Sequence, residues 1–123
     1  MLSASIGWIL IVSGIAAALG GLAALIFPEA VMRLIFGAEN RDRLTMFFVR
    51  HWGALLFVVC ALTAYSAFFP SSRVPILTAA IIEKAAVVLL IFSGSVKRTP
   101  AMTAIASTDG ILAAIFLAYL AGL

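Results

Sequence analysis

The sequence predicts an all-α integral membrane protein, a four-helix antiparallel bundle with a short amphipathic surface helix between its first two helices. Hydrophobic residues make up 65% of the 123 residues and charged residues only 11%, against about 25% charged in an ordinary soluble domain. About 20 apolar residues cross a bilayer, and the chain has four such runs, at residues 5–27, 44–69, 74–93 and 101–120. The connections are short enough to place consecutive helices antiparallel. We therefore expect residues 1–123 to form a single four-span domain.

The first run, residues 5–27, has no charged residue and is expected to remain as a transmembrane helix. Gly7, Gly14 and Gly21 recur every seven residues and so lie close to one helix face, where small residues let a neighbouring backbone approach. If this glycine stripe is buried within one chain, the bundle is self-sufficient. If it faces lipid, the chain is expected to dimerise.

Residues 28–43 follow and combine apolar with charged side chains. Val31, Leu34 and Ile35 are expected to share one face, which predicts a short amphipathic helix at the membrane surface that is broken near Gly37. The charged run at residues 39–43 reads as a solvated turn, with docking of a partner as the alternative.

Proline residues mark the ends of the later runs. Pro70 closes the second run, and Pro75 lies in the first turn of the third, where its missing N–H costs little. Residues 94–100 form the next turn, and the fourth run follows directly after Pro100.

The basic residues predict the orientation of the chain. The first and third loops together hold five of the Lys and Arg residues outside the runs and the second loop holds one, namely Arg33, Arg41, Arg43, Lys97 and Arg98 against Arg73. Because basic loops stay in the cytoplasm, we expect both termini to lie outside it, in a multi-pass protein of the cell (inner) membrane. The net charge of +3 is spread over short loops, which indicates contacts with membrane lipids and not with nucleic acid.

Five ionisable side chains interrupt the apolar runs: Arg50, His51, Glu83, Lys84 and Asp109. Each charged group at bilayer depth costs roughly 2.5–3.5 kcal/mol on insertion scales, so such groups are expected to face the bundle interior and to pair. Arg50 and Asp109 lie about 9 and 12 Å from the same end of their helices, which predicts an Arg50–Asp109 pair. Arg50–Glu83 is the alternative, and Lys84 lies about 100° round the helix from Glu83.

Two interpretations of these residues remain open. In the first, they form a structural polar core that fixes helix order and register, since polar side chains hold membrane helices together. In the second, they form a site for a lipid headgroup, a quinone or a proton. His51 has no companion histidine for a metal site, and we expect it to donate or accept a hydrogen bond and not to relay protons. Cys60 is expected to be a packing residue.

No catalytic residues can be assigned from motifs. The sequence has no phosphate-binding glycine loop, no His-Glu-x-x-His, no nucleophile elbow and no haem-attachment motif. Ser107 and Thr108 lie beside Asp109, but such hydroxyls usually bond to the carbonyl four residues earlier in their own helix. The protein is therefore expected not to be an independent enzyme.

Three segments carry a family resemblance: FFVRHWGALL, which contains Arg50 and Gly53, then IIEKAAVVLL and ASTDGILAAIF. With its four spans, the chain resembles the small membrane proteins grouped as DoxX-like. The resemblance implies a bacterial-type inner-membrane protein, in some cases a subunit or partner of quinone-linked oxidoreductases. Small multidrug-resistance transporters have a similar length, but their essential acidic residue lies in the first helix, and residues 5–27 contain none.

These observations lead to two functional hypotheses. The leading one is a small non-catalytic membrane protein with a buried charged cluster, acting as an accessory subunit or as a binder of a quinone or lipid headgroup. The alternative is a small proton-coupled transporter that works as a dimer, with Glu83 or Asp109 as the proton carrier.

Overall fold

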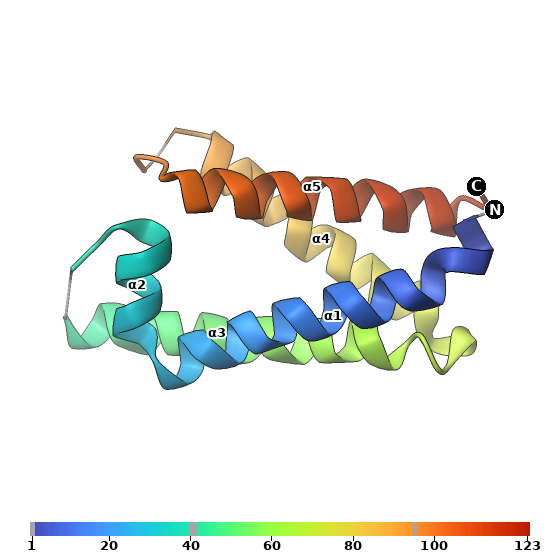
Figure 1. Ribbon diagram of the computed structural model, residues 1–123, viewed down its shortest axis with the longest axis horizontal. Coiled ribbons are helices and arrows are strands. Elements are labelled where there is room, and N and C mark those ends of the chain that lie inside the picture. Colours follow the sequence, from blue (N-terminus) through green and yellow to red (C-terminus); the bar gives the residue numbers. More distant parts are fainter. Residues whose placement is uncertain (1, 40–41, 95) are drawn as a thin grey trace.

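The computed structural model describes residues 2–39, 42–94 and 96–123, and within these residues the secondary structure is helical throughout, with no strand (Figure 1). The helices are α1 (Leu2–Ile26), α2 (Pro28–Phe36), α3 (Arg43–Tyr65), the short 3-10 helix η1 (Pro70–Ser72), α4 (Arg73–Phe92) and α5 (Pro100–Leu120). Four of them are long and apolar enough to cross a membrane: α1, α3, α4 with η1, and α5. The expected all-helical fold with four long apolar helices is confirmed.

The predicted short helix between the first two long helices is confirmed as α2. Pro28 lies at its start, where a missing N–H costs nothing. Gly37 ends it with a φ of 66° and donates its N–H to the Arg33 carbonyl, a left-handed conformation that glycine adopts without strain. Val31 is buried, whereas Leu34 is exposed, so the apolar face is narrower than expected. Asn40 and Arg41 of the predicted 39–43 turn lie outside the described residues, and Asp42 caps α3 by accepting the Thr45 N–H at 3.1 Å.

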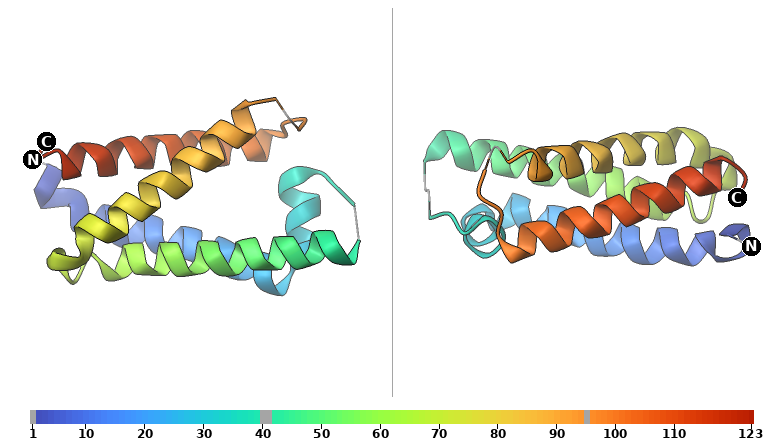
Figure 2. Two further views of the ribbon diagram at one scale, coloured as in Figure 1. Left: turned by 180° about the vertical axis from the view of Figure 1, so that it is seen from behind. Right: turned by 90° about the horizontal axis from the view of Figure 1, so that it is seen from above.

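α1 and α3 lie side by side with their backbones in contact (Figures 1 and 2). A Cβ atom on Gly14 would lie 2.7 Å from Ala64 N, and one on Gly21 would lie 2.6 Å from Phe57 N. On the other helix, a Cβ on Gly53 would lie 2.5 Å from Gly21 O. The predicted packing stripe is therefore buried within the chain at Gly14 and Gly21, although a Cβ on Gly7 would meet nothing within 4 Å.

α4 and α5 form a second pair, and two apolar clusters lie along it. The first joins α1 to this pair and contains Ile6, Leu10, Leu77, Ala80 and Phe116. The second lies nearer α2 and contains Ile91, Met102 and Ala106, with Ile35 and Phe36 of α2 packed against it. At the end where the termini lie, α4 is close to α3 and α5 is close to α1. Toward the other end, the α4–α5 pair diverges from the α1–α3 pair, and there α2 contacts α1, α3 and α5 (Figures 1 and 2).

α3 ends earlier than the apolar run suggests, at Tyr65 instead of near Phe69. The Ser66 hydroxyl donates to the Thr63 carbonyl at 2.6 Å, and Arg73 donates from Nε to Ser66 O and from Nη2 to Ala67 O, both at 2.8 Å. A guanidinium at a helix C-terminus satisfies carbonyls that have no partner in the helix. The prediction that the second span continues as helix to residue 69 is therefore wrong, because side-chain bonds terminate it first.

Candidate functional site

An ion pair joins α4 to α5 about halfway along both helices. Lys84 Nζ lies 3.2 Å from Asp109 Oδ1 and donates a hydrogen bond to it. Lys84 is only 4% exposed, and the Asp109 side chain is 16% exposed. A lysine this deeply buried requires a partner, because an unpaired buried charge is strongly unfavourable.

Glu83 completes this group, which we call the charged cluster (Glu83, Lys84 and Asp109). Its Oε2 lies 3.9 Å from Lys84 Nζ, which is beyond hydrogen-bond distance. This oxygen is buried and has no hydrogen-bond partner among the described residues, although the side chain as a whole is 22% exposed. The charged cluster therefore contains two ion pairs that share Lys84 Nζ. Only the pair with Asp109 is hydrogen-bonded, and Glu83 Oε2 still lacks a donor.

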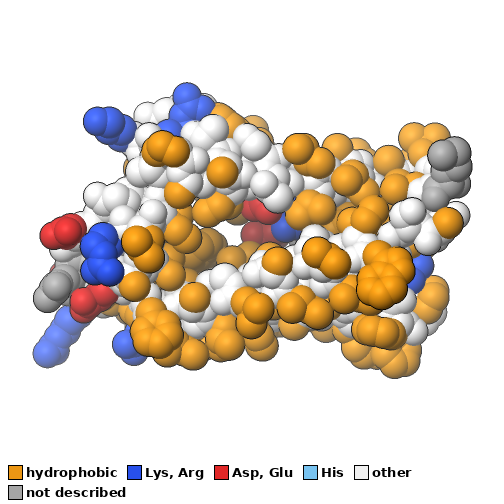
Figure 3. All heavy atoms as spheres, viewed as in Figure 1, with side chains coloured by type: hydrophobic (Ala, Val, Ile, Leu, Met, Phe, Trp, Pro, Cys, Tyr) orange, Lys and Arg blue, Asp and Glu red, His pale blue; other side chains and the backbone are white. Residues whose placement is uncertain are grey.

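The charged cluster lies in a hollow. Figure 3 shows acidic and basic side chains at the floor of a hollow between α5 and α1, halfway along the molecule. Glu83 and Asp109 are the acidic residues of the four long helices. Within the described residues, the backbones of α3 and α5 do not come within 8 Å of each other (Cα to Cα), and neither do those of α1 and α4, although side chains of α1 and α4 meet in the first apolar cluster. The hollow lies between the two helix pairs and leaves the charged cluster accessible from the side of the molecule (Figure 3).

Arg50 does not belong to the charged cluster. The prediction that Arg50 pairs with Asp109 is wrong, because Asp109 pairs with Lys84 and Arg50 is exposed on α3. Arg50 precedes Gly53 by three residues, and Gly53 packs on α1, a helix without any ionisable residue. The alternative Arg50–Glu83 pair is also absent from the described ion pairs.

His51 is also outside the charged cluster. Its side chain is exposed and stacks on Phe47 of the same helix, with ring centroids 6.5 Å apart and planes 6° apart. The structure therefore brings together three of the five predicted site residues and leaves the other two, Arg50 and His51, exposed on α3. The adjacent Trp52 packs edge-on against Phe36 of α2 at 6.1 Å.

Two threonine hydroxyls, one of α3 and one of α5, are bonded within their own helices. Thr63 donates to Val59 O at 2.9 Å, and Thr108 donates to Ala104 O at 2.9 Å, as its position beside Asp109 predicted. Cys60 is buried in α3.

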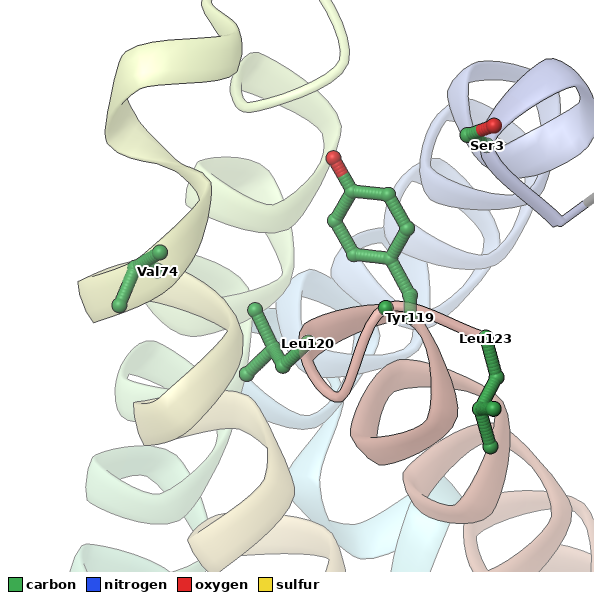
Figure 4. A pocket seen from close by; sticks show the side chains of 6 residues that line it. Ser3, Val74, Tyr119, Leu120 and Leu123 are labelled. Atoms are coloured by element: carbon green, nitrogen blue, oxygen red, sulfur yellow. The ribbon is translucent and has the colours of Figure 1, made fainter.

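A separate cavity of about 320 Å³ lies at the end of the molecule that holds both termini. Ser3, Val74, Tyr119, Leu120 and Leu123 line it, from α1, α4 and the end of α5 (Figure 4). Arg73 lies beside it but is occupied, since its Nη1 donates to the Tyr119 hydroxyl at 3.1 Å. This cavity holds no charged cluster and offers mainly apolar side chains.

In residues 2–39, 42–94 and 96–123, no group of three His, Cys, Asp or Glu side chains is placed to hold a metal ion. The charged cluster can hold a proton, a hydrogen-bonding head group or water. Comparison with protein-family models, curated proteins and solved structures found no match to the chain. The chemistry of the charged cluster is thus the strongest indication of function.

Proposed function

We propose that the protein is a small non-catalytic membrane protein whose hollow binds the polar head of an amphipathic molecule, a quinone or a lipid headgroup. In this proposal the four long helices cross the membrane as an antiparallel bundle, and the protein acts as an accessory subunit. The observation that carries the proposal is the position of the charged cluster, at the floor of a hollow that opens on the side of the molecule between α1 and α5 (Figure 3).

The surroundings of the hollow favour entry from the bilayer over entry from water. On the side of the termini, Leu10, Leu77 and Phe116 are fully buried in the first apolar cluster. On the other side, α2 packs Ile35 and Phe36 against Met102. An amphipathic molecule could reach the charged cluster laterally with its tail left among lipids, whereas a water-soluble solute would have to cross an apolar layer.

A purely structural role for the charged cluster explains less. A structural polar network is stabilising when each buried member has a partner, and Lys84 and Asp109 fulfil this requirement. Glu83 does not, because its buried Oε2 lacks a donor. The Glu83 side chain is 22% exposed, so a ligand donor in the hollow would complete the network once the carboxylate turned its buried oxygen toward it.

The same oxygen favours one second candidate, a small proton-coupled transporter working as a dimer with Glu83 as the carrier. Gly14 and Gly21 are packed against α3 within the chain, so they are not available as a dimer interface. Proton flux in reconstituted vesicles, measured for the wild type and for Glu83→Gln, would distinguish the transporter from the binding protein.

The orientation and the family resemblance remain part of the proposal. The basic residues near α2 and in the loop before α5 favour a cytoplasmic location for that end, with both termini outside. The resemblance to DoxX-like proteins favours an inner membrane and a quinone-linked partner.

The proposal is tested by thermal unfolding of the purified protein in a neutral detergent, with a quinone, a quinol and phospholipids added in turn. A ligand present at 100 times its Kd stabilises by about 2.7 kcal/mol, which shifts the melting temperature by several degrees. We expect such a shift for the wild type and for the control Arg50→Gln, and its loss in Glu83→Gln. If no ligand raises the melting temperature, and Glu83→Gln and Asp109→Asn both lower it sharply, the charged cluster is a structural core.

A further inference from the structure

The charged cluster carries an imbalance of charge. Glu83 and Asp109 are two acids, and Lys84 is the one base that faces them. Arg50 and His51, the remaining basic side chains near mid-helix, are exposed on α3. With all three groups ionised, the cluster therefore has one negative charge in excess, in a region where an uncompensated charge is costly.

The charged cluster also has more hydrogen-bond acceptors than donors. Lys84 donates to Asp109, while Glu83 Oε2 accepts from no described residue. The hydroxyls of Thr63 and Thr108 are committed to carbonyls of their own helices. What the hollow lacks is thus a donor with positive charge, and not a further acceptor.

On this basis we propose that the hollow selects a head group that donates hydrogen bonds and carries positive charge, a primary or secondary ammonium on an apolar tail. This inference rests on the proposed binding function and names the ligand class for the same site. A charge-assisted hydrogen bond from N–H to a carboxylate is about twice as strong as a neutral one, and an ammonium also cancels the excess charge. A phosphate or carboxylate head would add to the excess, and a quinone carbonyl would leave Glu83 Oε2 without a donor. The inference therefore narrows the ligands of the proposed function to molecules with an ammonium head and disfavours the quinone.

An ammonium head can come from a free lipophilic amine or from an aminophospholipid. In both cases the ammonium would meet Glu83, and in the lipid the phosphate would have to stay outside the hollow. Phosphatidylethanolamine and phosphatidylcholine form a matched pair for the lipid source, because they differ at the head in the presence of N–H donors. For the free source, dodecylamine, dodecyltrimethylammonium, dodecanol and dodecanoate share one tail length and separate charge from donor capacity.

The experiment measures the binding of these four single-chain compounds to the purified protein by calorimetry in a neutral detergent. We expect dodecylamine to bind roughly tenfold tighter than dodecanoate, with dodecyltrimethylammonium and dodecanol in between. In Glu83→Gln, the affinities for dodecylamine and dodecanoate should differ by no more than about threefold. In Arg50→Gln, the ratio of these two affinities should be the same as in the wild type. Asp109→Asn removes the same charge from the other helix and provides a second test if Glu83→Gln is poorly folded.

Competition against dodecylamine by nanodiscs of each phospholipid then identifies the source of the ammonium head. Displacement by phosphatidylethanolamine alone supports an aminophospholipid, and displacement by neither supports a free amine.

The inference is overturned if dodecanoate binds as tightly as dodecylamine with a dependence on Glu83, a result that would leave the proposed binding function intact. It is also overturned if Arg50→Gln changes the ratio as much as Glu83→Gln does. If none of the amphiphiles, quinones or lipids binds, the proposed function itself fails.

Discussion

The pair formed by α1 and α3 packs backbone against backbone, whereas the pair formed by α4 and α5 encloses charged groups. Between α1 and α3, Gly21 and Gly53 leave no space for even one additional carbon atom. Between α4 and α5 the corresponding glycine is looser, since a Cβ on Gly110 would meet Val88 Cγ2 at 3.6 Å, an ordinary van der Waals contact. The ion pair of Lys84 and Asp109 holds this second pair together at mid-depth.

The difference indicates a division of roles between the two pairs. In lipid there is little hydrophobic driving force between helices, so close packing of small residues and polar bonds hold them together. The α1–α3 pair uses the first of these and has no ionisable group on α1, which fits a rigid support. The α4–α5 pair uses the second and leaves Glu83 Oε2 without a donor, which fits a binding surface.

The largest expected effect comes from filling the glycine contact. Gly53→Leu would place a Cβ 2.5 Å from Gly21 O and 2.7 Å from Leu25 N, both of which are backbone atoms that cannot rotate away. We expect a loss of roughly 3 kcal/mol or more of unfolding free energy, visible as a collapse of the monodisperse peak in detergent and a lower melting temperature.

Gly20→Leu is the matched control for this change, because a Cβ on Gly20 would meet nothing within 4 Å. Gly20 lies on the facing helix α1, one residue from Gly21, and Gly20→Leu should be neutral or slightly stabilising, since leucine favours helix more than glycine does. Equal destabilisation by both changes would contradict the backbone-contact account of the α1–α3 pair.

The next largest loss of stability is expected from replacing Lys84, the basic residue of the charged cluster. Lys84→Met leaves Asp109 without its partner at 3.2 Å and two acids facing each other. Breaking a buried ion pair from one side costs about 3–5 kcal/mol, and because Glu83 and Asp109 are partly exposed, we expect about 2 kcal/mol here. Chemical or thermal unfolding in detergent measures the loss.

The double variant Lys84→Met/Asp109→Leu distinguishes the loss of the ion pair from a loss of packing. Replacing both partners with apolar residues of similar volume is often neutral or better, so we expect the double variant to recover most of the stability of the wild type. A double variant as unstable as Lys84→Met would show that the lysine acts through its packing and not through its charge.

A smaller effect is expected where Arg73 connects the two helix pairs. Its guanidinium donates to the Ser66 and Ala67 carbonyls at the end of α3 and to the Tyr119 hydroxyl of α5. Arg73→Gln should cost about 1–2 kcal/mol, because hydrogen bonds from charged groups are worth more than neutral ones. Tyr119→Phe removes only one of the three hydrogen bonds and should lower the unfolding free energy by less. A larger loss in Tyr119→Phe than in Arg73→Gln would show that the Arg73 hydrogen bonds are not the main connection between the helix pairs.

The sequence was sufficient to predict those features that depend on one helix at a time. Apolar run lengths gave the four long helices, Pro28 and Gly37 gave the bounds of α2, and the spacing of Gly14 and Gly21 gave a packing stripe. Each of these is a local property, because helix length, capping and face spacing follow from the chain alone.

The partners of the charged residues could not be predicted in the same way. Pairing across a bundle depends on which helices are neighbours, and a shift of one residue turns a side chain by about 100°. Lys84 lies about 100° round the helix from Glu83, so the two were not expected to need a common face, yet Lys84 Nζ lies within 4 Å of both acids and pairs most closely with Asp109. The divergence of the two helix pairs, which creates the hollow, also depends on α2 and left no pattern in the sequence.

The smallest effect tests this last point directly. Arg50→Gln changes a charge that was expected from the sequence to lie at the centre of the site, but the side chain is exposed on α3. Substitutions at exposed positions without partners usually stay within about 0.5 kcal/mol, so we expect the melting temperature of Arg50→Gln to match that of the wild type. Glu83→Gln in the same assay provides the comparison inside the hollow.

A fall in melting temperature for Arg50→Gln as large as that for Lys84→Met would mean that α3 turns toward α5 in the membrane and that Arg50 belongs to the charged cluster there. The cluster would then be balanced in charge, and its selectivity for an ammonium head would disappear with the hollow.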